Sequence, residues 1–310
     1  MTFAFVFPGQ GSQSVGMLNE LAEEFELVKD TFATASAVLG YDLWQVVNDG
    51  PEDRLNDTAT TQPAMLSAGV ATWRVWQEKQ GPLPSIMAGH SLGEYTALVC
   101  AGSIDFEDAV SLVADRGRFM QEAVPVGQGA MAAILGLSDD DVRQACSEAA
   151  QGEIVAAVNF NSPGQVVIAG QTAAVERAVE VAKVKGAKRA LMLPVSVPSH
   201  CQLMEPAAQQ LAQRLSAISI NPPIIPVLNN ADVQPAQQPD QIRDALIRQL
   251  YNPVRWVETI QAMKAQGVDT LVECGPGKVL VGLNKRIERE MNTFALTSPE
   301  TLSQALTTMG

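Results

Sequence analysis

Short apolar runs alternate with longer amphipathic stretches along much of the chain. Residues 3–7 (Phe-Ala-Phe-Val-Phe) form a continuous apolar run that ends at a proline–glycine turn, which is typical of a fully buried strand. Helical patterns follow through about residue 39 and again over about 61–80, where we expect Gln62-Pro63 at the helix start because proline is tolerated there. The alternation of strands and helices predicts an α/β fold with a mostly parallel sheet.

The middle of the chain has a different order of elements. Strand patterns and helical patterns succeed one another as βαββαβ, the order of a ferredoxin-like unit, over 130–137, 138–150, 154–160, 165–169, 172–185 and 188–193. Ser138 is the expected N-cap of the first helix, because three aspartates occupy the turn that follows it. We therefore predict a small ferredoxin-like domain over 126–196, inserted into a large α/β hydrolase-like catalytic domain over 1–125 and 197–310.

The remaining patterns return the chain to the large domain. An apolar, strand-like segment over 195–201 comes first. Helix and strand patterns then alternate up to residue 274, and the last twenty or so residues show no clear pattern. The expected elements are a helix over about 204–217, a strand over 225–229, helices over 239–249 and 256–266, and a strand over 270–274.

One segment has the pattern of a serine nucleophile. Gly89-His90-Ser91-Leu92-Gly93 reads G-x-S-x-G, and it lies between the apolar strand pattern of 85–88 and the helical pattern of 94–100. In such a nucleophile elbow the serine occupies a strained turn that lifts its Oγ clear of the sheet. The N-terminus of the following helix then favours negative charge at the same place. The sequence therefore predicts that Ser91 is a nucleophile.

A serine nucleophile needs a base, and the chain contains two histidines. His90 is adjacent to Ser91 on the turn, so we expect its side chain to point elsewhere. His200 lies in Val197-Pro198-Ser199-His200, at the expected end of an apolar strand, and is the favoured base. The neighbouring Cys201 is a rival nucleophile, but its local context is poorer than that of Ser91.

Composition excludes several other functions. The net charge of −13 argues against nucleic acid as the main partner. The four cysteines contain no C-x-x-C pair, which argues against zinc and suits a reducing cytosol. The N-terminus does not read as a signal peptide and no apolar run is long enough for a membrane span. The glycine-rich segments 9–14 and 275–279 lack residues that dinucleotide-binding and Walker loops require, so we interpret them as tight turns.

Arg116 has two interpretations at this point. It lies in Asp115-Arg116-Gly117-Arg118, within a helical pattern that spans about 105–122. It forms either a structural salt bridge or, if it is buried near the serine, a bidentate contact to a substrate carboxylate. The residues alone do not distinguish the two.

Several motifs occur together in a characteristic order. They resemble the malonyl-CoA:acyl carrier protein transacylases of bacterial type II fatty acid synthesis, from about residue 3 to about residue 290. One small departure is Cys274, where an apolar residue is expected, and it does not affect the chemistry. The motifs are Phe7-Pro8-Gly9-Gln10-Gly11-Ser12-Gln13, Gly89-His90-Ser91-Leu92-Gly93-Glu94-Tyr95, Arg116-Gly117, Asn159-Phe160-Asn161-Ser162-Pro163-Gly164-Gln165, Val197-Pro198-Ser199-His200, Gln249-Leu250-Tyr251-Asn252-Pro253-Val254-Arg255-Trp256 and Glu273-Cys274-Gly275-Pro276-Gly277.

The resemblance implies a cytoplasmic, monomeric enzyme that moves a malonyl group from malonyl-CoA to the phosphopantetheine thiol of acyl carrier protein. The transfer would be a ping-pong reaction through a malonyl-serine at Ser91, with His200 as general base and then general acid. The backbone N–H groups of Gln10 and Leu92 would form the oxyanion hole, and Arg116 would bind the malonyl carboxylate. No cofactor or metal is implied, and malonyl-CoA is a substrate.

The same resemblance assigns further roles at the edge of the site. A backbone carbonyl near Gln249 would orient the imidazole in place of a triad carboxylate. Asn159 and Asn161 would lie near the mouth between the two domains. Both substrates are anionic, so a local basic surface is also expected. Its candidates, which otherwise form an ordinary solvated face, are Lys183, Lys185, Lys188, Arg189, Lys285, Arg286 and Arg289.

Three rival functions stay open. A serine hydrolase on the α/β-hydrolase fold would share the elbow, but it expects its histidine near the C-terminus and an acid between serine and histidine. A stand-alone acyltransferase serving a polyketide synthase would use the same chemistry for a different carrier protein. A non-catalytic module that docks carrier proteins would not need the pair of Ser91 and His200.

Overall fold

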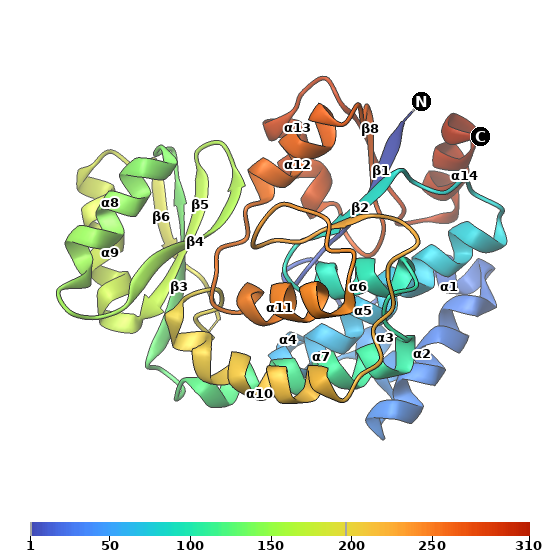
Figure 1. Cartoon of the computed structure of the whole chain (residues 1–310), viewed down its shortest axis with the longest axis horizontal. Coiled ribbons are helices and arrows are strands. Elements are labelled where there is room, and N and C mark those ends of the chain that lie inside the picture. Colours follow the sequence, from blue (N-terminus) through green and yellow to red (C-terminus); the bar gives the residue numbers. More distant parts are fainter. Residues whose placement is uncertain (1, 196) are drawn as a thin grey trace.

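The structure is a computed structural model that describes residues 2–195 and 197–310. It contains a parallel sheet and a separate antiparallel sheet, each covered by helices (Figure 1). The predicted class, an α/β protein with an additional βαββαβ unit, is confirmed. Positions 1 and 196, which limit two of the predicted domain ranges, lie outside the described residues, and the ranges themselves stay a prediction.

The larger part of the molecule is built on a parallel sheet. Its strands lie in the order β7-β2-β1-β8-β9, and each neighbouring pair is parallel. The carboxyl ends of the strands therefore lie at one edge, so the loops that follow them can meet there. The strands are β1 (Phe3–Phe7), β2 (Ile86–Gly89), β7 (Val227–Leu228), β8 (Thr270–Glu273) and β9 (Asn292–Ala295).

Both faces of this sheet are covered, as the continuous apolar strand pattern predicts. Alternate residues of β1 point to opposite faces: Phe3, Phe5 and Phe7 join one buried cluster, and Ala4 and Val6 join another. The helices of the first cluster include α5 (Thr58–Glu78), α6 (Gly93–Cys100) and α7 (Phe106–Ala123). Those of the second are α12 (Trp256–Ala265) and α13 (Val279–Ile287).

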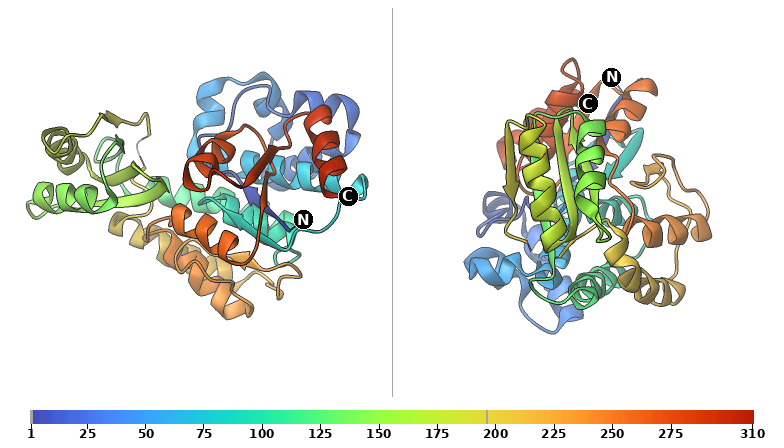
Figure 2. Two further views of the ribbon diagram at one scale, coloured as in Figure 1. Left: turned by 90° about the horizontal axis from the view of Figure 1, so that it is seen from above. Right: turned by 90° about the vertical axis from the view of Figure 1, so that its left-hand side faces the viewer.

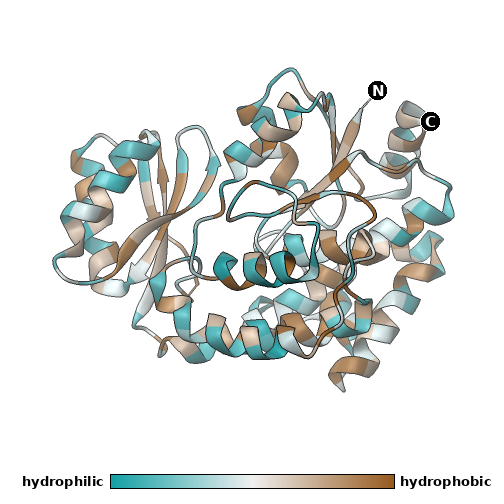
Figure 3. Ribbon diagram, viewed as in Figure 1, coloured by the Kyte–Doolittle hydropathy of each residue, from teal (hydrophilic) through white to brown (hydrophobic). Residues whose placement is uncertain are grey.

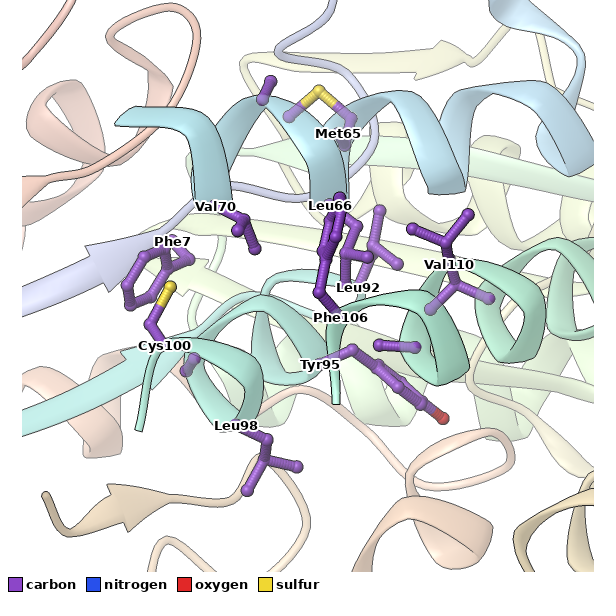
Figure 4. Packing of buried hydrophobic residues seen from close by; sticks show 14 of the residues in the cluster. Phe7, Met65, Leu66, Val70, Leu92, Tyr95, Leu98, Cys100, Phe106 and Val110 are labelled. Carbon is purple, nitrogen blue, oxygen red and sulfur yellow. The ribbon is translucent and has the colours of Figure 1, made fainter. Parts of the chain in front are cut away.

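The first cluster is the main core of the molecule. Figure 4 shows Leu66 of α5 beside Leu92 and Phe106, and Val70 of the same helix near Phe7 of β1. Full burial of each such side chain stabilises the fold by about 1.5–3 kcal/mol. This packing fixes α6 and α7, which carry the residues next to the predicted nucleophile, against the sheet.

Further helices surround the parallel sheet. Figure 3 shows apolar residues along the inner strands and polar residues on the outward faces of α10 and α11. These helices are α1 (Asn19–Glu24), α2 (Glu26–Leu39), α3 (Leu43–Asp49), α4 (Glu52–Asn56), the 3₁₀ helix η1 (Gln202–Met204), α10 (Glu205–Ser216), α11 (Pro239–Gln249) and α14 (Pro299–Met309).

The second sheet is antiparallel and has the strand order β4-β5-β3-β6, the ferredoxin-like arrangement. Two helices pack against one of its faces (Figure 2). As predicted, the Ser138 side chain caps the first of them by accepting from the Asp141 N–H. The elements are β3 (Gly129–Leu135), α8 (Asp139–Ala150), β4 (Val155–Ser162), β5 (Gln165–Gln171), α9 (Thr172–Val184) and β6 (Arg189–Met192).

The two parts are joined by hydrogen bonds along β4. The Phe160 N–H donates to the Val254 carbonyl (3.0 Å), and the Val254 N–H donates to the Val158 carbonyl (2.8 Å). Arg286 of α13 donates to the Gln165 side chain of β5 at 2.7 Å. The end of β4 is therefore fixed next to the parallel sheet.

Two local expectations are wrong. Helix α5 begins at Thr58, so Pro63 lies inside it and not at its start. Of the strand-like segment predicted over 195–201, residue 196 lies outside the described residues and the others belong to no strand. His200 has a φ of +66° in a turn before η1, and its N–H donates to the Leu250 carbonyl. Pro198 cannot donate to a strand ladder, which explains why the apolar pattern there does not form a strand.

Candidate active site

The turn between β2 and α6 is a nucleophile elbow. Ser91 has a φ of +52°, a strained conformation for a residue with a side chain. A Cβ atom at Gly89 would overlap the backbone of Gly93, and a Cβ atom at Gly93 would overlap the carbonyl of Phe7. Strand, turn and helix thus approach one another so closely that only glycine fits at both positions.

Ser91 and His200 form a hydrogen-bonded pair. The Ser91 Oγ lies 2.8 Å from the His200 Nε2, and the His200 Nδ1 lies 2.8 Å from the backbone carbonyl of Gln249. Since a carbonyl only accepts, Nδ1 carries the proton and Nε2 is free to accept from the serine hydroxyl. Burial, and secondarily the positive charge of Arg116, lowers the pKa of His200 to about 3, which keeps the imidazole neutral.

Two backbone N–H groups near Ser91 have no acceptor among the described residues: those of Gln10, after β1, and Leu92, after the serine. The turn that carries Gln10 approaches the elbow closely, because a Cβ atom at Gly9 would lie 2.5 Å from the His90 carbonyl oxygen. Unpaired N–H groups at this position can donate hydrogen bonds to a developing oxyanion.

Arg116 of α7 is buried, with 1% of its surface exposed. Its Nη1 donates to the Gln62 Oε1 (2.8 Å), and its Nη2 donates to the Gln249 Oε1 (3.1 Å) and the Ser91 Oγ (3.4 Å). The guanidinium also stacks on the Tyr95 ring.

Within the described residues, no carboxylate lies within salt-bridge distance of Arg116, and its Nε has no hydrogen-bond partner. The structural salt bridge considered from the sequence is therefore not formed. What the fold provides instead is a buried cation with neutral partners beside the nucleophile, an arrangement that favours an incoming anion.

His90, Asn159 and Asn161 lie where the two sheets meet. The His90 Nε2 is 2.8 Å from the Asn161 Oδ1, and its ring packs on Trp256, so its side chain points away from the Ser91–His200 pair as expected. Asn159 is half-buried, and its Oδ1 has no partner among the described residues. Both asparagines come from β4, which places the antiparallel sheet beside the elbow.

Cys201 does not have the properties of a nucleophile. Its side chain is buried and its Sγ donates to the Pro198 carbonyl at 3.2 Å. Burial raises the pKa of its thiol to about 11, so the thiolate is scarce at neutral pH.

Three residues at the site were not predicted from the sequence: Gln62, Glu94 and Asn230. All three are buried and hydrogen-bonded to the serine turn, Arg116 or Gln249. Two of them carry a weak signal. Glu94 is a charged residue in an otherwise apolar helix, and Asn230 is a polar residue that follows a short apolar strand, at the edge where sites collect.

The described residues lack two other kinds of functional feature. They contain no group of three or more His, Cys, Asp and Glu side chains that is arranged to hold a metal ion. Among the helices that they form, none has both the length and the apolar character required to cross a bilayer.

The chain is similar to known proteins of one enzyme family. Residues 4–297 match the model of the acyl transferase domain family. The malonyl CoA-acyl carrier protein transacylase of Escherichia coli (strain K12) is 61% identical over 304 residues, which are 98% of each chain. The structure of an acyl carrier protein S-malonyltransferase from Vibrio cholerae is 60% identical, with a TM-score of 0.96 over 98% of this chain and 99% of that one.

A third comparison includes a partner. A malonyl-transacylase solved in complex with its type II polyketide synthase acyl-carrier protein is 59% identical to the chain. The two align with a TM-score of 0.99 over 99% of this chain and 100% of that one.

Proposed function

The chain belongs to the acyl transferase family, and we propose that it carries out the reaction for which its bacterial relatives are named. It transfers a malonyl group from malonyl-CoA to the phosphopantetheine thiol of an acyl carrier protein. Its residues act in two half-reactions at one site, with a malonyl-serine between them.

The observation that carries this proposal is the position of Arg116. A buried guanidinium without a carboxylate partner lies 3.4 Å from the nucleophilic oxygen of Ser91. A simple esterase has no use for such a charge, whereas a malonyl thioester brings a free carboxylate into the same space. Bidentate hydrogen bonding would place that carboxylate and present the thioester carbonyl to Ser91.

In the first half-reaction the Ser91 Oγ attacks the thioester carbonyl of malonyl-CoA, and its proton passes to the His200 Nε2. The carbonyl oxygen becomes an oxyanion, which the N–H groups of Gln10 and Leu92 stabilise. The C–S bond then breaks, and His200 returns the proton to the departing CoA sulfur. The Gln249 carbonyl holds the imidazole and stabilises its transient charge.

The second half-reaction runs the same steps with a different thiol. The phosphopantetheine sulfur of the carrier protein gives its proton to His200 and attacks the malonyl-serine ester. Collapse of the second oxyanion breaks the ester bond, and Ser91 recovers its proton. Transfer between thioesters is nearly isoenergetic, so the site has to lower the barrier and exclude water.

Several further features belong to the proposal. No cofactor takes part, because acyl transfer changes no oxidation state and the pair of Ser91 and His200 supplies nucleophile and proton transfer. The enzyme works as a monomer in the cytoplasm. The predicted division of the chain is part of the proposal: residues 1–125 and 197–310 form the catalytic domain and residues 126–196 form the small domain. Asn159 and Asn161 lie near the entrance between the two.

The carrier protein belongs to fatty acid synthesis, as in the family that the motifs resemble. A carrier protein of a type II polyketide synthase is the second candidate. The observation in support of this second candidate is the 59% identical transacylase whose structure was solved with such a carrier protein. The chemistry of the site is the same for both.

An acceptor test distinguishes a transferase from a hydrolase. After loading with malonyl-CoA and removal of free nucleotide, the acyl-enzyme is mixed with phosphopantetheinylated carrier protein or with buffer. We expect malonyl-carrier protein to form far faster than free malonate. Equal rates of malonate release with and without the carrier protein would contradict the proposal, and a fatty acid and a polyketide carrier protein compared side by side would identify the preferred client.

A further inference from the structure

Two buried polar residues beside the Ser91–His200 pair have no role in the steps above. Glu94 lies in the first turn of α6 and is 2% exposed, and Asn230 follows β7 and is 1% exposed. A carboxylate is costly to bury unless its oxygens accept hydrogen bonds. The partners of Glu94 therefore indicate what it holds in place.

The Asn230 side chain connects the two ends of the nucleophile turn. Its Nδ2 donates to the Gly89 carbonyl and its Oδ1 accepts from the Ser91 N–H, both at 2.7 Å. Because Ser91 is held in a strained conformation with positive φ, these bonds on either side of it restrict the turn to one geometry.

Gln249 performs the corresponding task for the base. Its backbone carbonyl accepts from the His200 Nδ1, and its side-chain Oε1 accepts from Arg116. Its Nε2 donates to the Ser91 carbonyl at 3.0 Å and to the Glu94 Oε2 at 2.8 Å. Any displacement of Gln249 would move both the imidazole and the guanidinium.

Glu94 joins these two segments through a single atom. Its Oε2 accepts from the Asn230 N–H at 2.9 Å and from the Gln249 Nε2 at 2.8 Å. We propose that Glu94 is a positioning residue that sets the distance between the Ser91 Oγ and the His200 Nε2 through Asn230 and Gln249. This inference rests on the proposed function, because that function makes Ser91 and His200 the reacting pair.

The charges around Glu94 indicate that its acceptor oxygen matters more than its charge. Burial, and to a smaller extent Asp232, raises the pKa of Glu94, whereas its hydrogen bonds and the nearby Arg116 lower it, and the resulting pKa is about 7. Both donors reach one oxygen, which the amide oxygen of glutamine can replace without a change of shape. Glu94→Gln should therefore keep the geometry, and Glu94→Ala should lose it.

Rapid mixing of the enzyme with malonyl-CoA tests this role. The rate constant of the acyl burst reports how the reacting atoms are placed, and its amplitude reports the folded fraction. We expect Glu94→Ala to lower the rate constant roughly 50-fold with its amplitude retained, because misplacement by about 1 Å costs up to about a hundredfold. Glu94→Gln should stay within about fivefold of the wild type.

A matched control is available at Glu273, a buried carboxylate of β8 that also accepts two N–H bonds, from Leu280 and Val281. Glu273→Ala should lower the burst amplitude or the stability while leaving the rate constant unchanged. A Glu94→Ala rate constant within about threefold of the wild type, or a pattern equal to that of Glu273→Ala, would overturn the inference.

Asn230→Ala keeps the test decisive if Glu94→Ala does not fold. It retains Glu94 and removes only the two side-chain bonds to the serine turn, so the rate constant should fall about tenfold. In that case a rate constant within about threefold of the wild type overturns the inference. Failure of the proposed function itself looks different, since the wild type would then give no acyl burst at all.

Discussion

The two sheets place polar side chains differently. In the parallel sheet, residues that follow β1, β2 and β7 meet at one edge: Gln10, Ser91 and Asn230 come from segments far apart in the sequence. In the antiparallel sheet the strand ends alternate, and Asn159 and Asn161, its polar residues at the site, both come from β4. Of the buried polar residues described, that sheet supplies Asn161 and Ser162 alone. Parallel pairing thus brings functional side chains together at the carboxyl-terminal edge of the sheet. The antiparallel sheet lies beside this edge and borders the site.

The largest expected effect separates the two histidines. His200 belongs to the parallel edge and contacts Ser91, whereas His90 turns toward Asn161 of the antiparallel sheet. His200→Ala should slow acylation by malonyl-CoA by about a thousandfold or more, because nucleophile activation and acid catalysis fail together. His90→Ala, the matched control, should lose much less. The opposite order of effects would reverse the two roles.

Substitutions of Arg116 test whether the residues at the edge of the parallel sheet also select the substrate. Loss of about 3 kcal/mol of charge-assisted hydrogen bonding would lower kcat/KM for malonyl-CoA by roughly a hundredfold in Arg116→Ala. Acetyl-CoA has no carboxylate, so its transfer should fall much less or even rise. Arg116→Lys should restore malonyl transfer only in part, because an ammonium does not reproduce two parallel donors. Equal proportional losses for both substrates would show that Arg116 is structural.

The pH dependence of kcat/KM reports how far the His200 imidazole is shielded from water. Burial lowers the pKa of His200 from 6.5 to about 3, and its neutral form is the base. The kcat/KM for malonyl-CoA should therefore stay level as the pH falls through 6.5, wherever the fold survives. The contribution of His200 to stability should decline in that range, because the unfolded imidazole gains a proton that the folded one does not bind. Glu94 and Glu273, whose pKa values are raised to about 7, chiefly by burial, contribute to stability in the opposite direction. An acid limb near 6.5 would indicate a solvated imidazole.

The smallest expected effect concerns the contact between α13 and the antiparallel sheet. Arg286 contacts Gln165 of the antiparallel sheet, whereas Lys183 is paired with Glu180 on the surface of α9. If Arg286 contributes to docking, Arg286→Ala should raise KM for the carrier protein about two- to fivefold, leave malonyl loading unchanged and weaken the salt dependence. Lys183→Ala should change neither. A loss of malonyl loading in Arg286→Ala would show that the contact between Arg286 and the antiparallel sheet is needed for the geometry of the active site.

The same contrast explains what could be predicted from the sequence. The antiparallel unit was predicted element by element, since its contacts are local and its alternation is clear. The elbow was predicted because Ser91 lies between two adjacent elements. The prediction of a strand before His200 was wrong. Val197 and Pro198 are buried there, but they lie in a loop and not in a strand. The short strand β9 and helices α3, α4, α13 and α14 were not predicted.

The supporting residues of the site were harder to find. Glu94, Gln62 and Asn230 come together only through long-range contacts between α5, α6 and the loop after β7. The sequence carries only a weak signal for Glu94 and Asn230 and none for Gln62, because the partners of all three residues lie far away along the chain. For Arg116 the residues alone did not distinguish a salt bridge from a carboxylate contact, and its role as a carboxylate ligand came from the family resemblance; its burial and its neutral partners became visible only in the structure.

The proposed reaction requires that Ser91 carries the malonyl group. Brief incubation with malonyl-CoA, followed by acid quench, digestion and peptide mass measurement, tests it directly. We expect one added malonyl mass on the peptide that contains Ser91, and none in the Ser91→Ala variant. Malonyl on the peptide that contains Cys201, or an adduct that persists in Ser91→Ala, would contradict the account.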